Sequence, residues 1–354
     1  MKINLFLELP MKTIFKYTLL VLLMGSCKNK TEQPVAIKET TKNDLVIAFG
    51  SCNRQSFENK LWQPVLENNS VAWIWGGDII YSDTDDMDLM AKNYEQQLAQ
   101  EDYTKITQSM KILGTWDDHD YGLNDGGLEY VAKAESQQLF LDFMGVSKTD
   151  KRREREGVYH SEIIETDKGS VKVIVLDTRY FRSALTPSEN PEHRYQPNVY
   201  GEGTMLGDAQ WQWLENELNS SPADFNLIVS SIQFLSAEHG FETWGTMPHE
   251  VDKLTSLISD SKAKGVIVLS GDRHISEFSK TTIEGVNYPL IDFTSSGMTH
   301  SYSSFDGELN QYREGEVVSD LSFGILKVNF EKKQVIMQMR GENNVLQQEL
   351  IQAY

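Results

Sequence analysis

The sequence predicts an α/β protein with one domain from Leu45 to Tyr354. Short apolar runs of strand length alternate along the chain with segments that have apolar residues at helical spacing. Polar residues gather directly after several of these runs, where α/β sheets place their ligands. After about Ser276 the pattern becomes rich in strands. No internal repeat is visible, and no convincing linker interrupts the segment.

The predicted elements follow from these patterns in chain order. The strand-like runs of the first part are Leu45–Phe49, Val71–Trp75, Lys111–Trp116, Val171–Leu176, Leu227–Ile232 and Val266–Leu269. The helical patterns are Lys60–Asn69, Met87–Gln108, Glu129–Met144, Asp208–Asn219 and His249–Ala263. The later strands are Glu277–Ile283, Tyr288–Thr294, Ser322–Asn329, Gln334–Arg340 and Leu346–Leu350. The alternation in the first part is the reason for the α/β class.

Composition excludes some classes of function. The chain has 354 residues with 40% hydrophobic and 24% charged residues, which is ordinary for a soluble globular protein. Its net charge is -19 and it has no cluster of Lys and Arg, so nothing indicates a nucleic-acid-binding surface. The acidic balance also argues against electrostatic docking on anionic lipid. It does not exclude a phosphate substrate, because bound cations reverse the field locally.

The N-terminus resembles a bacterial lipoprotein signal peptide. Lys12 and Lys16 precede an apolar stretch at 17–24, and Met24-Gly25-Ser26-Cys27 resembles a lipobox. The apolar stretch is too short for the alternative, a membrane-spanning anchor. We therefore expect export to the bacterial cell envelope, with membrane attachment only through a lipid on Cys27.

This interpretation divides the start of the chain into two parts. Residues 1–26 form the signal peptide, and 27–44 form a polar tether without apolar periodicity. Met11 is a better start than Met1, because Glu8 and Pro10 do not suit the beginning of a signal peptide.

Cys52 is the second of only two cysteines. Once Cys27 is acylated, Cys52 has no disulfide partner, and a lone thiol in an exported protein calls for a reason. Metal ligation is one reason, and an inert buried thiol is the alternative.

Four polar clusters follow strand-like runs. They are Phe49–Asn53, Trp75–Tyr81, Thr115–Tyr121 with Asn124 close behind, and Leu269–His274. Each cluster alone is weak evidence, because a Gly-Gly-Asp or an Asp-Asp-His-Asp run is often only a turn or a helix cap. Together they can converge on one edge of the sheet and bring Cys, Asp, Tyr, His and Asn side chains to one place.

Such a collection of side chains indicates metal binding. Carboxylates held this close repel each other unless a cation lies between them. Oxygen ligands beside a thiolate and an imidazole suit a transition metal, and an all-oxygen subsite suits calcium or magnesium.

The motifs resemble those of a known family. The run from Gly77 to Tyr81 resembles the Gly-Asp-x-x-(His/Tyr) motif of metallophosphatases. With the Cys52 cluster, Trp116–His119 and Leu176–Tyr180, it resembles the alkaline phosphatase D, or PhoD-like, branch over about Leu45 to Gly297. The resemblance implies a metallophosphatase-type two-sheet β-sandwich flanked by helices, with metal ions at the strand ends.

The resemblance also implies ligands for Fe³⁺ and Ca²⁺. Cys52, Asp78 and Tyr81 match the ferric-iron ligands, and Asp78 would bridge to a second metal, calcium in this branch. Asp118 falls on a metal-binding Asn of the superfamily, and Asp272 and His274 fall on its final Gly-His-x-His motif. Asn124 would add a further oxygen ligand.

Two further residues match catalytic positions. His119 falls on the histidine that contacts phosphate or protonates the leaving group. Arg179 can bind phosphate oxygens as a bidentate fork, although a structural pair with Asp177 explains it equally well. Arg182 and Arg273 are weaker candidates for the same role. His239 and His300 match no motif but are the other histidines expected to approach the cleft.

The function implied by the resemblance is hydrolysis of phosphate monoesters, diesters or both by a metal-bound hydroxide. The alternative is a non-catalytic surface lipoprotein that binds a metal or ligand on the same scaffold. The intact Asp-Asp-His-Asp and Gly-Asp-Arg-His runs favour the enzyme.

Overall fold

Two β-sheets packed face to face organise residues 43–354, the part of the chain that the computed structural model describes. The predicted signal peptide, the lipid attachment at Cys27 and nearly all of the tether at 27–44 lie outside the described residues. No helix within 43–354 is both long and apolar enough to cross a membrane.

The first sheet has six strands in the order β15-β14-β13-β1-β2-β3. Their bounds are β1 Leu45–Gly50, β2 Ala72–Gly76, β3 Lys111–Thr115, β13 Phe323–Asn329, β14 Gln334–Arg340 and β15 Leu346–Ala353. β1, β2 and β3 are parallel, whereas β13, β14 and β15 add antiparallel strands on the other side of β1. The parallel strands therefore end at one common edge.

The second sheet has seven strands in the order β12-β10-β11-β9-β8-β5-β4. Their bounds are β4 His160–Glu165, β5 Ser170–Val175, β8 Phe225–Val229, β9 Val266–Ser270, β10 Ser276–Thr282, β11 Pro289–Ser295 and β12 Arg313–Val318. β5, β8, β9 and β11 are parallel. A separate short hairpin joins β6 Thr186–Pro187 to β7 Tyr195–Gln196.

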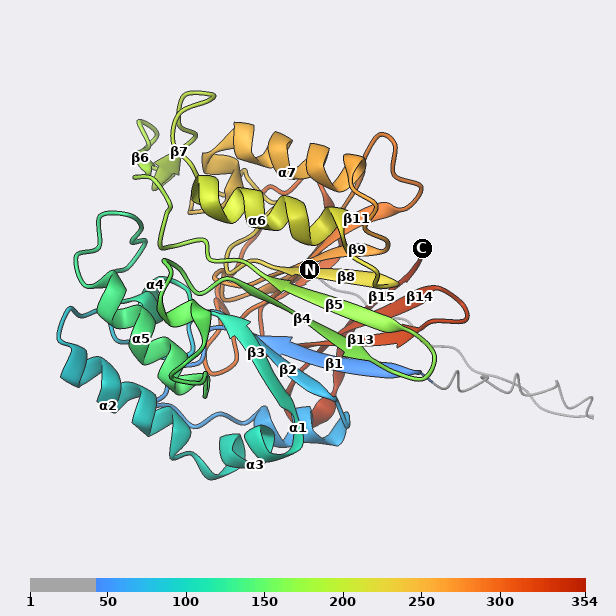
Figure 1. Cartoon of the computed structure of the whole chain (residues 1–354), viewed down its shortest axis with the longest axis horizontal. Coiled ribbons are helices and arrows are strands. Elements are labelled where there is room, and N and C mark those ends of the chain that lie inside the picture. Colours follow the sequence, from blue (N-terminus) through green and yellow to red (C-terminus); the bar gives the residue numbers. More distant parts are fainter. Residues whose placement is uncertain (1–42) are drawn as a thin grey trace, which may run out of the picture. The chain divides into compact units, whose positions relative to one another are not determined.

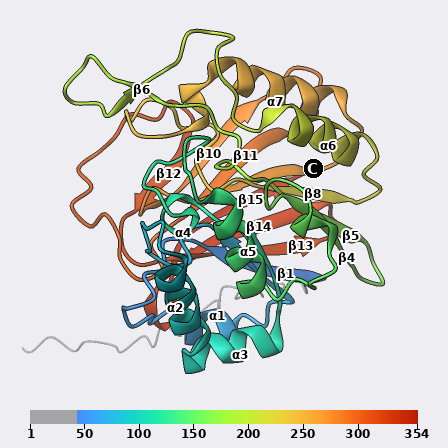
Figure 2. The ribbon, with the colours of Figure 1, turned by 60° about the vertical axis from the view of Figure 1, so that its left-hand side comes forward.

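Helices cover the outer faces of both sheets (Figures 1 and 2). α1 Trp62–Glu67, α2 Met87–Leu98, α3 Glu101–Ser109 and α5 Lys133–Phe143 lie against the six-stranded sheet. α6 Gly207–Asn219 and α7 Pro248–Asp260 cover the seven-stranded sheet. The short elements are α4 Asp118–Tyr121, η1 Lys151–Arg153, η2 Trp244–Thr246 and η3 Glu342–Asn344.

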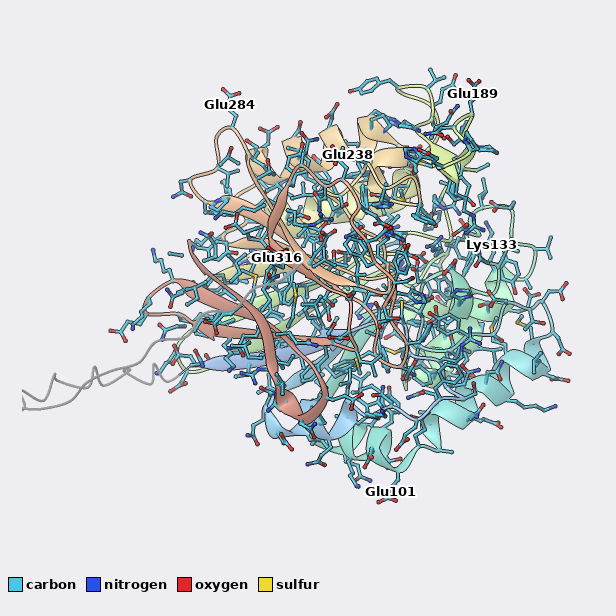
Figure 3. All side chains as sticks on the ribbon, turned by 180° about the vertical axis from the view of Figure 1, so that it is seen from behind. Glu101, Lys133, Glu189, Glu238, Glu284 and Glu316 are labelled. Carbon is cyan, nitrogen blue, oxygen red and sulfur yellow. The ribbon has the colours of Figure 1, made fainter. Side chains whose placement is uncertain are left out.

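Three apolar layers hold this arrangement together, one between the sheets and one beneath the helices of each sheet. The layer between the sheets is made of alternate strand residues such as Ile47, Val173 and Ile267. The layer beneath α1 and α3 is aromatic, and the rings of Trp62 and Trp73 meet edge to face at 5.1 Å. At the surface, Glu101, Glu189 and Glu284 project from the periphery (Figure 3).

The predicted fold class is confirmed, and so is the two-sheet sandwich that the family resemblance implied. The prediction of one helix over 87–108 is wrong, because Gln100 takes an extended conformation with φ -67° and ψ 124° that separates α2 from α3. The predictions missed β4 and β12. Both are partly exposed strands whose polar residues hide the strand pattern.

Candidate metal centre

The candidate ligands lie at the edge where the parallel strands of both sheets end. Cys52 follows β1, Asp78 follows β2, and Asp118 begins the short helix α4 directly after β3. Asp272 and His274 follow β9 of the other sheet. The sequence predicted convergence on one sheet edge, and the structure shows that both sheets contribute.

Among the described residues, three overlapping groups can hold a metal ion. They are Cys52, Asp78 and His274; Asp78, Asp118 and His119; and Asp117, Asp118 and Asp272. Within each group the ligand atoms lie within 4.8 Å of one another. Asp78 and Asp118 each belong to two groups, so the three form a continuous chain of ligands rather than separate sites.

Asp78 is the centre of the first group. Its Oδ2 accepts hydrogen bonds from the Cys52 thiol at 3.3 Å and from the Tyr81 hydroxyl at 3.2 Å. The same hydroxyl lies 3.2 Å from Nε2 of His274. Asp78 Oδ1 is buried and has no hydrogen-bond partner. A buried carboxylate oxygen without a partner is costly, and a cation bound there would satisfy it.

The ligands are held in a strained backbone. Cys52, Asp78, Asp272 and His274 have φ values of 59°, 52°, 69° and 55°. Non-glycine residues rarely adopt positive φ, and such strain gathers at functional sites because the surrounding structure maintains it. Four of the candidate ligands therefore share this uncommon backbone conformation.

Buried hydrogen bonds fix the loop after β2 to its neighbours. The Asn53 amide donates to the carbonyl of Asp78 at 2.8 Å. The side chain of Gln55 accepts from the amide of Tyr81 at 2.9 Å. Asp120 accepts from the amides of Asp78 and Ile79 at 3.3 and 3.1 Å. These contacts position Asp78 and Tyr81 before any ligand binds.

Gly77 allows the close approach of two of these loops. Its φ is +96°, and a Cβ there would lie 2.4 Å from Cβ of Asp117. A larger residue at this position would separate Asp78 from the carboxylates after β3.

Electrostatics of the centre favour bound cations. Burial raises the pKa of Cys52 to about 12 and that of Asp272 to about 7, and it raises the pKa of Asp78 well above its usual value. Neighbouring anionic groups contribute to the same increases. The thiol, phenol and carboxylate groups cannot all carry their negative charges at once unless cations offset them. Together with the imidazole, these donors fit the metal ions that the resemblance implied.

His119 is the third member of the second group. Its Nδ1 is 2.7 Å from Oδ1 of Asp83, and its ring stacks on Tyr81 with centroids 4.1 Å apart. Burial alone would lower the pKa of His119, but Asp78 and the hydrogen bond with Asp83 raise it to about 10. His119 therefore holds a proton near neutral pH, and its Nε2 is the nitrogen that Asp83 leaves free.

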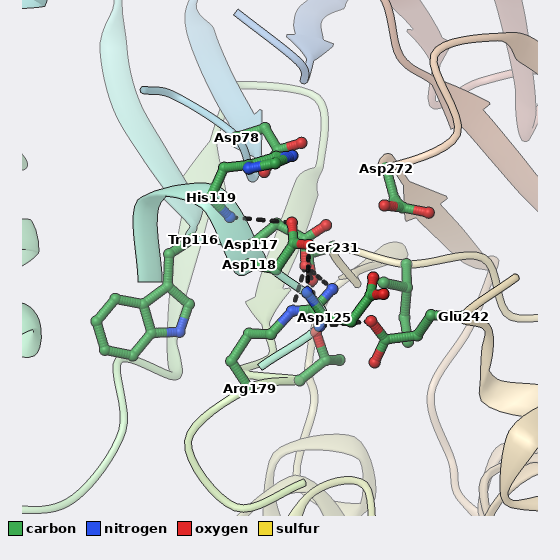
Figure 4. Close-up of polar contacts among 12 residues, drawn as sticks. Asp78, Trp116, Asp117, Asp118, His119, Asp125, Arg179, Ser231, Glu242 and Asp272 are labelled. Carbon is green, nitrogen blue, oxygen red and sulfur yellow. Dashed lines mark hydrogen bonds and ion pairs between the residues drawn. The ribbon is translucent and has the colours of Figure 1, made fainter. Parts of the chain in front are cut away.

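Arg179 lies beneath the carboxylates and is fully buried (Figure 4). Its guanidinium pairs with Asp117 and Glu242, each at 2.5 Å. Asp177 forms no ion pair with this guanidinium. Its carboxylate instead accepts hydrogen bonds from the Trp116 indole and from backbone amides, including that of Arg179. Burial raises the pKa of Asp118, but Arg179 and His119 outweigh it and lower that pKa below its usual value.

The structure places the predicted residues unequally. Six of them, Cys52, Asp78, Asp118, His119, Asp272 and His274, fall within the three groups, and Tyr81 contacts Asp78, His119 and His274. Arg179 is adjacent through Asp117. Asn124 is exposed, and no hydrogen bond joins it to the described ligands; Asp125 instead donates its amide to Asp118 at 2.7 Å. The metal-binding and catalytic roles of all these residues stay predictions.

Several neighbours were not predicted. Asp117 completes the third group, Asp83 holds His119, and Glu242 pairs with Arg179. Asp117 stands in the predicted Asp-Asp-His-Asp run, so the signal was present but assigned to its neighbour. Glu242 carries no local signal. His300 approaches the centre as expected, with its ring 4.4 Å from that of His274.

Comparison with known proteins identifies the family of this chain. The family model of PhoD-like phosphatases matches residues 47–345. The chain belongs to the PhoD-like phosphatase family. The resemblance stated from the motifs is thereby confirmed.

One curated relative of this PhoD-like phosphatase is alkaline phosphatase D of Bacillus subtilis (strain 168). The two are 29% identical over 140 residues, which cover 35% of this chain. The match spans only 24% of the length of the relative.

Solved structures share the fold. The structure of PhoD superposes with a TM-score of 0.67 at 17% identity, covering 88% of this chain and 68% of that chain. GAP50, the anchor in the inner membrane complex of Plasmodium, gives 0.57 at 12% identity over 88% and 89% of the two chains. A dimetal phosphatase from Danio rerio gives 0.53 at 13% identity over 88% and 100%.

Proposed function

We propose that this PhoD-like phosphatase is a metal-dependent hydrolase of phosphate esters. The observation that carries the proposal is the chain of overlapping ligand groups, in which His119 is held by Asp83. Monoester and diester substrates both fit this chemistry.

The ligand types suggest two kinds of ion. Cys52, Asp78, Tyr81 and His274 would hold Fe³⁺, because thiolate, phenolate and imidazole suit a transition metal. Asp117, Asp118 and Asp272 would hold Ca²⁺, which prefers oxygen ligands. When bound, these ions supply Lewis-acid chemistry that neutralises phosphate charge and yields hydroxide from water near neutral pH.

The side chains of the protein supply the remaining parts of the mechanism. Asp83 orients His119 through Nδ1, so that Nε2 can donate its proton to the leaving oxygen. Tyr81 packs against the ring of His119 and limits its motion. Arg179 keeps a positive charge beside Asp117 and Asp118, and its proposed contact with phosphate would need release from Asp117 or Glu242.

Export and lipid anchoring belong to the same proposal. The signal-like segment at 1–26 and Cys27 support a protein held at the cell envelope through a lipid. Expression in a bacterial host should yield a mature chain that starts at an acylated Cys27, visible by mass spectrometry. Cys27→Ala should abolish acylation. An unmodified Cys27 in the wild-type protein would contradict this part.

Activity is tested with a panel of simple esters. The metal-loaded protein should hydrolyse 4-nitrophenyl phosphate or bis(4-nitrophenyl) phosphate, and a chelator should abolish turnover until metal is returned. Elemental analysis of the same sample should find iron and calcium. Absence of turnover on both esters by a metal-loaded sample would contradict the proposal.

A specific observation keeps a second candidate open. GAP50 shares the fold and is described as an anchor, so the architecture alone does not imply catalysis. A non-catalytic protein of this kind would bind metal without hydrolysing either ester, and the same panel separates the two.

A further inference from the structure

Three arginines near the metal centre already have carboxylate partners. The pairs are Arg179 with Asp117 and Glu242, Arg182 with Glu242, and Arg273 with Glu308. Each of these guanidinium groups would have to give up an ion pair before it could bind a substrate anion. The arginine that binds such an anion most readily is one without an acidic partner.

Arg54 is such an arginine. It follows Cys52 by two positions, and within 43–354 its guanidinium forms no ion pair. The guanidinium carbon lies 4.6 Å from the ring centroid of Tyr81 and 5.4 Å from that of Phe57. Its Nε is shielded from solvent and has no hydrogen-bond partner. A shielded donor without an acceptor is unfavourable, and an incoming anion would satisfy it.

His300 presents a second unpartnered nitrogen close to Tyr81. Its Nε2 is shielded from solvent and has no partner, while its ring lies 4.9 Å from that of Tyr81. Thr299 connects it to Arg54, because its Oγ1 accepts from the amide of Arg54 at 2.8 Å and lies 3.1 Å from Nδ1 of His300. Thr299 thus joins the backbone of Arg54 to the ring of His300, and the Arg54 guanidinium and the His300 ring both lie against Tyr81.

Phe57 adds an apolar surface next to these polar groups. Its ring is 6.0 Å from that of His300, and the residue is 47% exposed. We call Arg54, Phe57 and His300 the Arg54 rim. The rim combines an unpaired cation, an imidazole nitrogen and an accessible aromatic ring beside one end of the metal centre.

We propose that the Arg54 rim binds the alcohol side of the substrate and selects esters that carry a second anionic group there. This inference rests on the proposed function, since it assigns the reacting phosphate to the metal centre. The unpaired guanidinium binds the second anion, and Phe57 packs against an aromatic or apolar part of the alcohol. In a protein of net charge -19, such a local cation also offsets the repulsion of a doubly anionic substrate.

Binding of non-hydrolysable phosphonates tests the proposal independently of turnover. The metal-loaded full-length protein is titrated calorimetrically with 4-carboxyphenylphosphonate and with its neutral carboxylic methyl ester. Wild type should bind the carboxylate about tenfold more tightly. Arg54→Gln should reduce that ratio to about one, whereas Arg54→Lys should retain part of it. The matched control Arg152→Gln, at a surface pair with Asp150, should keep the full ratio.

The outcomes are distinct. A wild-type ratio near one, or an unchanged ratio in Arg54→Gln with normal metal content and circular dichroism, would overturn the role of the rim. The corresponding phosphate esters give a second arm, in which the ratio of kcat/KM should follow the same pattern. If wild type binds the phosphonates with the expected ratio but hydrolyses neither ester, the proposed phosphoesterase function is contradicted and the anion-binding role of the Arg54 rim is supported.

Discussion

The two ends of the metal centre differ in chemistry and in support. The thiol end consists of Cys52, Tyr81 and His274, and the carboxylate end consists of Asp117, Asp118 and Asp272. The first end mixes sulfur, oxygen and nitrogen donors, whereas the second offers oxygen alone. Asp78 lies between them through its membership of two ligand groups. The proposed iron and calcium sites would therefore differ in the donors that they offer.

The support of each end explains how the fold tolerates so much negative charge. At the carboxylate end, the buried Arg179 offsets Asp117 and Asp118 from below. At the thiol end, hydrogen bonds from Ser296 to Cys52 at 3.0 Å and from Tyr81 to Asp78 hold the donors in place. The first end is therefore supported by a side-chain cation, and the second by hydrogen bonds.

Asp78→Asn tests whether the two ends act together. Losing the shared carboxylate should reduce turnover by about 10³-fold or more, because both ions lose a ligand. The unfolding midpoint should change little. The matched control is Asp88→Asn on the exposed side of α2, which should leave turnover unchanged. Near-normal activity of the Asp78 variant would remove the connection between the ends.

Arg179→Met tests the support of the carboxylate end. The change leaves Asp117 and Glu242 buried without their cation, and it should lower the free energy of unfolding by about 3–5 kcal/mol. Urea unfolding of the metal-free protein measures the effect. Arg152→Met at a surface pair should cost no more than about 1 kcal/mol. Equal losses in the two variants would show that Arg179 gives no special support.

Cys52→Ser and Asp272→Asn test the different metal preferences of the ends. Cys52→Ser should lower iron content several-fold and weaken the visible charge-transfer colour expected of thiolate and phenolate ligands. Asp272→Asn should lower calcium content instead. Elemental analysis and absorption spectra measure both. Parallel loss of both ions in both variants would contradict separate sites.

Asp83→Asn tests the proton that His119 holds. The pKa of His119 is raised to about 10, so the imidazolium is present below that pH and is lost as pH rises through it. Removing the Asp83 charge should lower this pKa and move the alkaline limb of the kcat profile down by about one pH unit. Profiles from pH 7 to 11 measure the shift. An unmoved limb would assign the limb to another group.

Local patterns predicted most of the centre. Cys52, Asp78, Asp118 and His274 each follow an apolar strand, and the ends of parallel strands meet at one edge. The Gly-Asp and Asp-Asp-His motifs are contiguous in sequence, so a reader of the sequence can find them. The position of Asn124 near a motif did not predict where its side chain lies, because the turn after α4 decides this, and the residue is exposed.

Long-range partners could not be predicted. Glu242 is 63 positions from Arg179 along the chain, and nothing in either local sequence announces their contact. The predicted fork of Arg179 onto phosphate and its predicted alternative, a pair with Asp177, both overlooked this partner. Arg54 received no role from the sequence, because an unpaired cation is recognised only when every possible partner is located.

The sequence by itself determined the α/β class, the strand ends that carry the ligands, and the family to which the chain belongs. These properties depend on local periodicity and on contiguous motifs, which are visible in the sequence without any structure. The tertiary structure decided how the two sheets share the centre, which arginines have acidic partners, and what surrounds His119. Those properties depend on contacts between residues far apart in the chain, and only the packing of the two sheets brings them within a few ångströms.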